Sequence, residues 1–157
     1  MAWFGLNAVT QRNQFERMRE RGFQAYTSYY IHRVGVEEAF RQLLDYVLDG
    51  VEHLYVTVDI DVVSGAHAPG TGAPSFAGLE AHELLTVMRM VGGVQELVGL
   101  DLSEVNPELD PTARTALLAA NALMAALGPR LLERAEPVPP EIYSEVFVGE
   151  RSSVAAS

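Results

Sequence analysis

The sequence contains no cysteine, few positive charges and no long apolar run, and each of these absences excludes a class of function. Without cysteine, disulfide bonds, thiolate metal sites and a cysteine nucleophile are excluded. Lysine and arginine number 11 against 21 aspartates and glutamates, and the net charge of −10 argues against nucleic-acid or anionic-membrane partners. No apolar stretch reaches the roughly 18 residues of a membrane helix, and the first residues show no signal-peptide pattern, so we expect a cytoplasmic protein.

The spacing of apolar residues predicts alternating strands and helices in a chain of 157 residues, 48% of them hydrophobic. We expect strands at residues 3–6, 23–26, 53–59 and 97–102, and helices at 10–21, with Thr10 as N-cap, 36–48, 79–91 and 111–127. Strands separated by helices form a parallel sheet with helices on both faces, so the predicted class is α/β. Residues 129–157 contain several prolines and lack apolar periodicity, which predicts an extended C-terminal tail.

Asp59 and Asp61 directly follow an apolar, β-branched run, at the carboxyl end of a predicted strand. Side chains at positions i and i+2 of a strand point to the same face, about 7 Å apart. A half-buried pair of like charges is unfavourable unless cations or hydrogen-bond donors compensate it, and two divalent metal ions would do so. The alternative is a pair of solvated or helix-capping aspartates.

The surroundings of this pair form an ordered series of motifs. The pair is followed by residues 68–74 (APGTGAP), and the next predicted strand ends in residues 99–107 (GLDLSEVNP). Asp110 and residues 114–116 (RTA) then begin an Ala-rich helix. From about residue 55 to residue 127, this series resembles the C-terminal region of the arginase, agmatinase and formimidoylglutamase superfamily, the ureohydrolases.

The resemblance implies a three-layer α/β/α fold with a mainly parallel sheet, arginase-like but incomplete, over residues 1–128. It implies that Asp59 and Asp61 bind a cluster of two Mn²⁺ ions. Glu104 would bind the cationic amidine or guanidine group of a small-molecule substrate, because a fixed carboxylate accepts two parallel N–H bonds from a planar cation. Asp101 is expected to form supporting bonds, no residue is assigned a catalytic role with certainty, and a homo-oligomer is expected.

Three features favour formimidoylglutamase, which hydrolyses a C–N bond of N-formimidoyl-L-glutamate to give L-glutamate and formamide. Residues 64–65 (SG) stand where arginases and agmatinases usually have Asp-Pro, Ala73 stands where they usually have Thr, and the RTA triplet is closer to formimidoylglutamases. Residues 69–72 (PGTG) are closer to agmatinases. An agmatinase- or arginase-type guanidine hydrolase is therefore the alternative.

Part of the family's metal site is missing from the sequence. The family supplies further ligands from an upstream histidine and an Asp-Ala-His-x-Asp strand end, and nothing like these occurs between Met1 and Tyr55. His67 follows the aspartate pair but is not a family ligand. Because two carboxylates alone do not bind a dinuclear cluster tightly, we predict that this chain alone is inactive or nearly so and depends on a missing N-terminal half. A non-catalytic α/β scaffold or oligomerisation module is the rival hypothesis.

Overall fold

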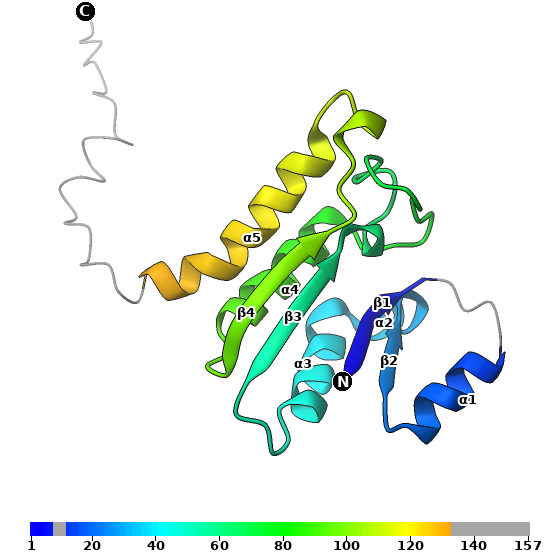
Figure 1. Ribbon diagram of the computed structural model, residues 1–157, viewed down its shortest axis with the longest axis vertical. Helices are drawn as coiled ribbons and strands as arrows, with labels where there is room; N and C mark the ends of the chain where they lie inside the picture. Colours follow the sequence, from blue (N-terminus) through cyan, green and yellow to red (C-terminus); the bar gives the residue numbers. More distant parts are fainter. Residues whose placement is uncertain (8–11, 133–157) are drawn as a thin grey trace, which may run out of the picture.

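The computed structural model describes residues 1–7 and 12–132, and these residues form strands that alternate with helices (Figure 1). The predicted α/β class is confirmed. In chain order the elements are β1 (Ala2–Leu6), α1 (Arg12–Glu20), β2 (Gln24–Thr27), α2 (Ser28–Val34), α3 (Val36–Val47), β3 (Leu54–Asp59), the 3-10 turn η1 (Ile60–Val62), α4 (Ala81–Gly92), β4 (Leu97–Ser103), the 3-10 turn η2 (Pro107–Leu109) and α5 (Arg114–Leu132).

The four described strands form two separate two-stranded sheets, and both are parallel. β1 pairs with β2, and β3 pairs with β4 in a register that places Asp59 opposite Ser103. Each pair is joined by a crossover through a helix, α1 for the first and α4 for the second. β3 and β4 therefore end at the same edge of their sheet, where the chain leaves both strands (Figure 1).

The core lies between the β3–β4 sheet and the helices that pack on one of its faces. Val58 of β3 is buried with Leu84 and Met88 of α4 and with Ala122 and Ala126 of α5. α3 packs beside α4 in a second cluster that also contacts this face of the sheet. The many alanines of α5 present small side chains, which lets its backbone approach α4 closely.

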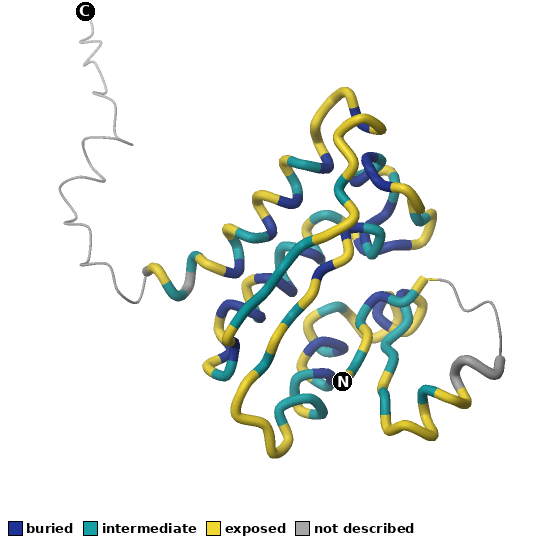
Figure 2. The backbone as a smooth tube through the Cα atoms, viewed as in Figure 1, coloured by how far each residue is buried: buried dark blue, intermediate teal, exposed yellow. Residues whose placement is uncertain are grey.

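The opposite face of the β3–β4 sheet is exposed among the described residues. Tyr55, Thr57 and Asp59 alternate with less exposed residues along β3 (Figure 2), and the side chain of Tyr55 is 62% exposed. The sequence predicts helices on both faces, whereas the described helices cover the face that carries Val58. The arginase-like layered fold is thus present in incomplete form, as predicted.

Three local features differ from the sequence prediction. The short helix α2 was not predicted; the Thr27 hydroxyl caps it by accepting a bond from the Tyr30 N–H at 3.2 Å. β1, whose short apolar sequence predicts a buried strand, is half-buried, with Trp3 37% exposed. α5 begins at Arg114 and runs to Leu132, into the predicted tail, while Thr10 and residues 133–157 lie outside the described residues.

No helix in the described ranges is both long and apolar enough to span a bilayer.

Candidate metal and substrate site

Three acidic residues follow the carboxyl ends of the adjacent strands β3 and β4. Asp59 is the last residue of β3, Asp61 lies two residues later, and Glu104 comes immediately after the end of β4. The pairing of Asp59 with Ser103 places Glu104 at the same edge of the sheet. In open parallel sheets ligands bind beyond this edge.

Asp61 does not continue the strand, which corrects the expected geometry of the aspartate pair. β3 ends at Asp59, and Asp61 lies within η1, where its N–H donates to Asp59 Oδ1 at 2.9 Å. The strand spacing of i and i+2 side chains therefore does not apply to this pair. Asp59 caps the turn, which is the alternative that the sequence left open, and it is also exposed at the wall of a groove.

Both aspartates line a groove of about 570 Å³ between the β1 strand and the end of β3. The walls are residues 3–7 of β1 and its end, Val62, and residues 73–77 of the loop that follows η1. Ala73, which stands where arginases and agmatinases are expected to have Thr, is one of these wall residues. The groove is thus bounded by segments from three separate parts of the chain.

The acids interact electrostatically at this edge. Burial raises the pKa of Asp61, and the negative charges of Asp59 and then of Glu104 raise it further. Within residues 1–7 and 12–132, none of the three forms an ion pair with a basic side chain. Among the described residues, the site therefore concentrates negative charge without a basic side chain to balance it, which favours binding of a cation.

Glu104 has an unusual backbone conformation, with φ of 65°. A non-glycine residue in this left-handed region costs on the order of 1–3 kcal/mol and occurs preferentially at functional sites. This conformation occurs at the first residue after β4. Nothing in the sequence signals it, because Glu is not a residue that favours positive φ.

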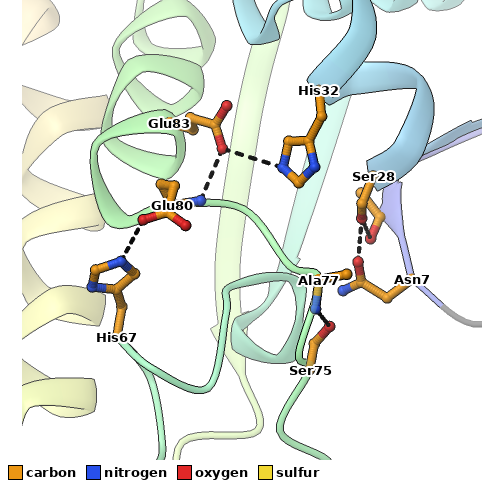
Figure 3. Close-up of polar contacts among 9 residues, drawn as sticks. Asn7, Ser28, His32, His67, Ser75, Ala77, Glu80 and Glu83 are labelled. Carbon is orange, nitrogen blue, oxygen red and sulfur yellow. Dashed lines mark hydrogen bonds and ion pairs between the residues drawn. The ribbon is translucent and has the colours of Figure 1, made fainter.

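Two further residues contact Asp61, and neither was singled out as a site residue from the sequence. The Thr71 hydroxyl donates to Asp61 Oδ1, and the Asn7 side-chain amide donates to the Asp61 carbonyl at 3.4 Å. The Ser28 hydroxyl donates to Asn7 Oδ1 (Figure 3), which links the end of β1 to α2. The residue types fit such roles, but only the fold brings them to Asp61.

The structure places His67, Asp101 and also His32 in contacts with residues other than Asp59, Asp61 and Glu104. His67 Nε2 lies 2.6 Å from Glu80 Oε2, and His32 Nε2 lies 3.7 Å from Glu83 Oε2, both at the N-terminus of α4 (Figure 3). Asp101 accepts bonds from the hydroxyls of Tyr55 at 2.8 Å and Thr57 at 2.9 Å, on the exposed sheet face.

The donor set fits a divalent metal in kind but not in number. Carboxylate oxygens suit Mn²⁺, and Asp59 and Asp61 both border the groove. However, no group of three or more His, Cys, Asp or Glu side chains in the described part of the chain is arranged to bind an ion. A complete dinuclear site needs further ligands beyond these two.

The fold and the site together define an α/β protein with a carboxylate-lined candidate metal site at the ends of parallel strands. The sequence profile of the Arginase family matches residues 1–128. The chain belongs to the arginase family. The match includes the first 54 residues, which lie outside the series of motifs from about residue 55 to residue 127.

Relatives in the family have different activities in their names. Over 109 residues, the chain is 38% identical to the formimidoylglutamase of Corynebacterium efficiens, and this match covers 69% of this chain and 34% of that protein. Over 106 residues, it is 37% identical to putative agmatinase 1 of Schizosaccharomyces pombe, and this match covers 68% of this chain and 26% of that protein. These identities do not discriminate between the two activities.

Solved structures show the same fold. The formimidoylglutamase of Bacillus subtilis matches with a TM-score of 0.78 and 26% identity, over 83% of this chain and 41% of that chain. The proclavaminate amidinohydrolase of Streptomyces clavuligerus matches with a TM-score of 0.70 and 34% identity, over 81% of this chain and 41% of that chain. The chain thus spans less than half the length of the proteins it matches.

Proposed function

We propose that this chain contributes part of the active site of a manganese-dependent hydrolase that cleaves a C–N bond in a small amidine or guanidine. The supporting observation is the gathering of Asp59, Asp61 and Glu104 at the carboxyl ends of two paired parallel strands, next to a groove. Membership of the arginase family supports the reaction class.

In this proposal Asp59 and Asp61 bind Mn²⁺ through carboxylate oxygens, and their ionised forms are stabilised when the ions are present. The chemistry that divalent ions supply in such a site is the activation of water for attack on carbon. Glu104 orients the substrate by accepting N–H bonds from its cationic group. The remaining metal ligands come from a segment outside this sequence, either in the same polypeptide or in a second one.

The proposed substrate is N-formimidoyl-L-glutamate, with L-glutamate and formamide as products. Ala73 supports this choice. It lines the groove with a methyl group, at a position where arginases and agmatinases are expected to have Thr. A guanidine such as agmatine or arginine is the alternative substrate. Measuring whether the complete site hydrolyses N-formimidoyl-L-glutamate or a guanidine distinguishes these two substrates.

A non-catalytic scaffold is a second candidate, favoured by the absence of a third metal ligand among the described residues. It predicts that supplying the rest of a family-length protein brings no gain in metal binding or activity. The same experiment therefore separates the two functions.

Complementation provides the test. The chain is produced alone and together with the segment of the Corynebacterium efficiens formimidoylglutamase that lies outside its match with this chain. Bound Mn²⁺ is measured by metal analysis, and product release is measured with N-formimidoyl-L-glutamate, agmatine and arginine. We expect Mn²⁺ binding and turnover in the complemented sample and little of either in the chain alone; no binding and no turnover with any substrate would reject the hydrolase.

Two variants assign the roles within this test. Asp61→Asn should abolish tight Mn²⁺ binding, whereas Glu104→Gln should leave Mn²⁺ content within about twofold and lower kcat/KM by about 100-fold or more. Glu108→Gln, a nearby exposed acid in η2 whose side chain lies outside the groove walls, is the matched control and should change neither quantity.

A further inference from the structure

A buried carboxylate 49 positions away in sequence is linked to Asp61 through hydrogen bonds. Asp110 is 4% exposed and lies between η2 and α5. Its Oδ2 accepts from the Thr115 N–H at 2.8 Å and from the Thr115 hydroxyl at 2.9 Å. Its Oδ1 accepts from the Thr112 N–H at 3.1 Å and from the Thr112 hydroxyl at 2.5 Å. These donors lower the pKa of Asp110, so it is an anion at neutral pH.

The Thr115 hydroxyl extends this arrangement to the loop of residues 64–78. Because its proton is donated to Asp110, its oxygen is free to accept, and it accepts from the Gly70 N–H at 2.8 Å. The Asn106 N–H donates to the Gly70 carbonyl at 2.7 Å. Gly70 is thereby hydrogen-bonded through its N–H to the first turn of α5 and through its carbonyl to the segment that joins β4 to α5.

The approach of Gly70 to this segment is closer than any side chain permits. A Cβ at Gly70 would lie 2.7 Å from Asp110 Cβ, 2.9 Å from Thr115 Oγ1 and 3.1 Å from the Asn106 carbonyl oxygen. Only glycine fits at such distances without displacing backbone. The glycine of the PGTG motif therefore has a defined structural role in this contact.

The next residue, Thr71, contacts the candidate metal ligand. Thr71 is 2% exposed, and its hydroxyl donates to Asp61 Oδ1. No described residue donates to Asp61 Oδ2. Asp110, Thr115, Gly70 and Thr71, which we term the Asp110 network, thus connect a buried anion to one oxygen of Asp61 and leave the other without a protein donor.

Capping of α5 does not account for this network. A cap requires an acceptor for the free backbone N–H groups of the first turn of α5, and the bond from the Thr115 N–H fulfils that requirement. The bond from the Thr115 hydroxyl to Asp110 and the bond from Gly70 to that hydroxyl add nothing to the helix. Their effect is to fix the loop that carries Thr71.

We propose that Asp110 and Thr115 are positioning residues, which act through Gly70 and Thr71 to fix the side chain of Asp61 so that its Oδ2 is presented for metal binding. The inference rests on the proposed function in taking Asp61 as a metal ligand. Partners that orient a metal ligand in this way change metal affinity by about 10–100-fold when they are removed.

The test removes the Thr115 hydroxyl without changing the shape of the side chain. Thr115→Val deletes the network bonds, Thr115→Ser restores the hydroxyl, and Thr86→Val is the control, because the Thr86 hydroxyl donates only to the His82 carbonyl on an exposed part of α4. In the metal-free chain, amide exchange of Gly70 and the Thr71 side-chain rotamer are measured by NMR. Mn²⁺ affinity is measured in whichever sample binds the ion, the chain alone or complemented.

We expect Thr115→Val to accelerate Gly70 exchange by at least about tenfold, to average the Thr71 rotamer, and to weaken Mn²⁺ binding by at least about tenfold. Thr115→Ser should restore all three quantities to within about threefold of the original protein, and Thr86→Val should alter none of them. A purely structural role would lower the melting temperature of Thr115→Val but leave Mn²⁺ affinity, measured well below that temperature, unchanged. That outcome, or an unchanged Thr71 rotamer, overturns the proposal.

Two provisions keep the outcomes separate. If Thr115→Val does not fold, Asp110→Asn is used with the same measurements, since it retains one acceptor oxygen but lacks the charge that orients both hydroxyls. If the original protein binds no Mn²⁺ in any sample, the proposed function fails. The exchange and rotamer measurements in the metal-free chain still decide whether Thr115 controls Thr71.

Discussion

Gly92, at the end of α4, is the position where a single added methyl group should be most informative. A Cβ at Gly92 would lie 2.2 Å from the carbonyl oxygen of Ala126 and 2.9 Å from its carbonyl carbon, both backbone atoms of α5. Van der Waals contact begins near 3.4 Å, so α4 and α5 would have to separate by about 1 Å at this crossing. The buried residues between the helices, among them Met88 and Ala122, would lose contact as a result.

Overpacking of this kind costs about 1–3 kcal/mol, and the better helix propensity of Ala returns at most about 1 kcal/mol. We therefore expect Gly92→Ala to lower the free energy of unfolding by about 1–2 kcal/mol. The adjacent Gly93 is the matched control: its Cβ would meet nothing closer than 3.5 Å, so Gly93→Ala should lie within about 0.5 kcal/mol of the original protein.

Urea unfolding followed by far-ultraviolet circular dichroism measures both variants. With equal slopes, the midpoints compare directly. A midpoint for Gly92→Ala equal to or above that of Gly93→Ala would refute the close approach of α4 to α5, because the largest difference between the two substitutions is what the methyl group meets.

The remaining predictions concern charge and backbone strain. Hydrogen bonds, first from the Thr112 hydroxyl, lower the pKa of Asp110 in the folded state from 3.8. The ionised carboxylate therefore contributes its full stability above pH 3.8, and this contribution is lost as the pH falls through the pKa of the folded state. Asp110→Asn should therefore reduce the fall in urea midpoint that the original protein shows below pH 4. Because the pKa of Asp61 is raised in the folded state, its ionised form destabilises the metal-free fold at neutral pH. Asp61→Asn should therefore raise the urea midpoint at pH 7 but not at pH 3. An equal rise at both pH values would contradict an electrostatic origin of the effect. Since Glu104 has φ of 65°, Glu104→Gly should relieve strain and stabilise the fold by about 1 kcal/mol, which thermal unfolding can check, whereas an unchanged melting temperature would argue against strain.

Much of the fold could be predicted because the main elements have strong patterns. The apolar spacing of residues 36–48 and the β-branched run of residues 53–59 correspond closely to α3 and β3. α2 was missed because it has seven residues, of which only Ser28 and Ile31 are buried, so no apolar period is visible. Its start depends on the Thr27 cap, a signal that also occurs in turns.

For the candidate site, the sequence predicts residue types but not their geometry, and the roles of these residues stay predictions. Motif order identified Asp59, Asp61 and Glu104, but the change from strand to 3-10 turn between the two aspartates is decided by the Asp59 cap. The contact of Thr71 with Asp61 depends on the loop that carries Thr71. Gly70 of that loop is held by Thr115, 45 positions away, and no local pattern encodes this contact. For the same reason, the exposed sheet face was not foreseen, because periodicity indicates which side of a strand is apolar and not what covers the other side.

The division of the described strands into two pairs has a consequence for laboratory work on the chain. Every described strand has at least one edge whose N–H and C=O groups lack a partner strand among the described residues. Such edges are templates for pairing with further copies, and isolated two-stranded ribbons resist this poorly. An oligomer of this chain seen in size-exclusion chromatography would therefore be ambiguous evidence for a native quaternary structure. If adding the complementing segment dissociated that oligomer, its copies would be shown to pair only through the free strand edges.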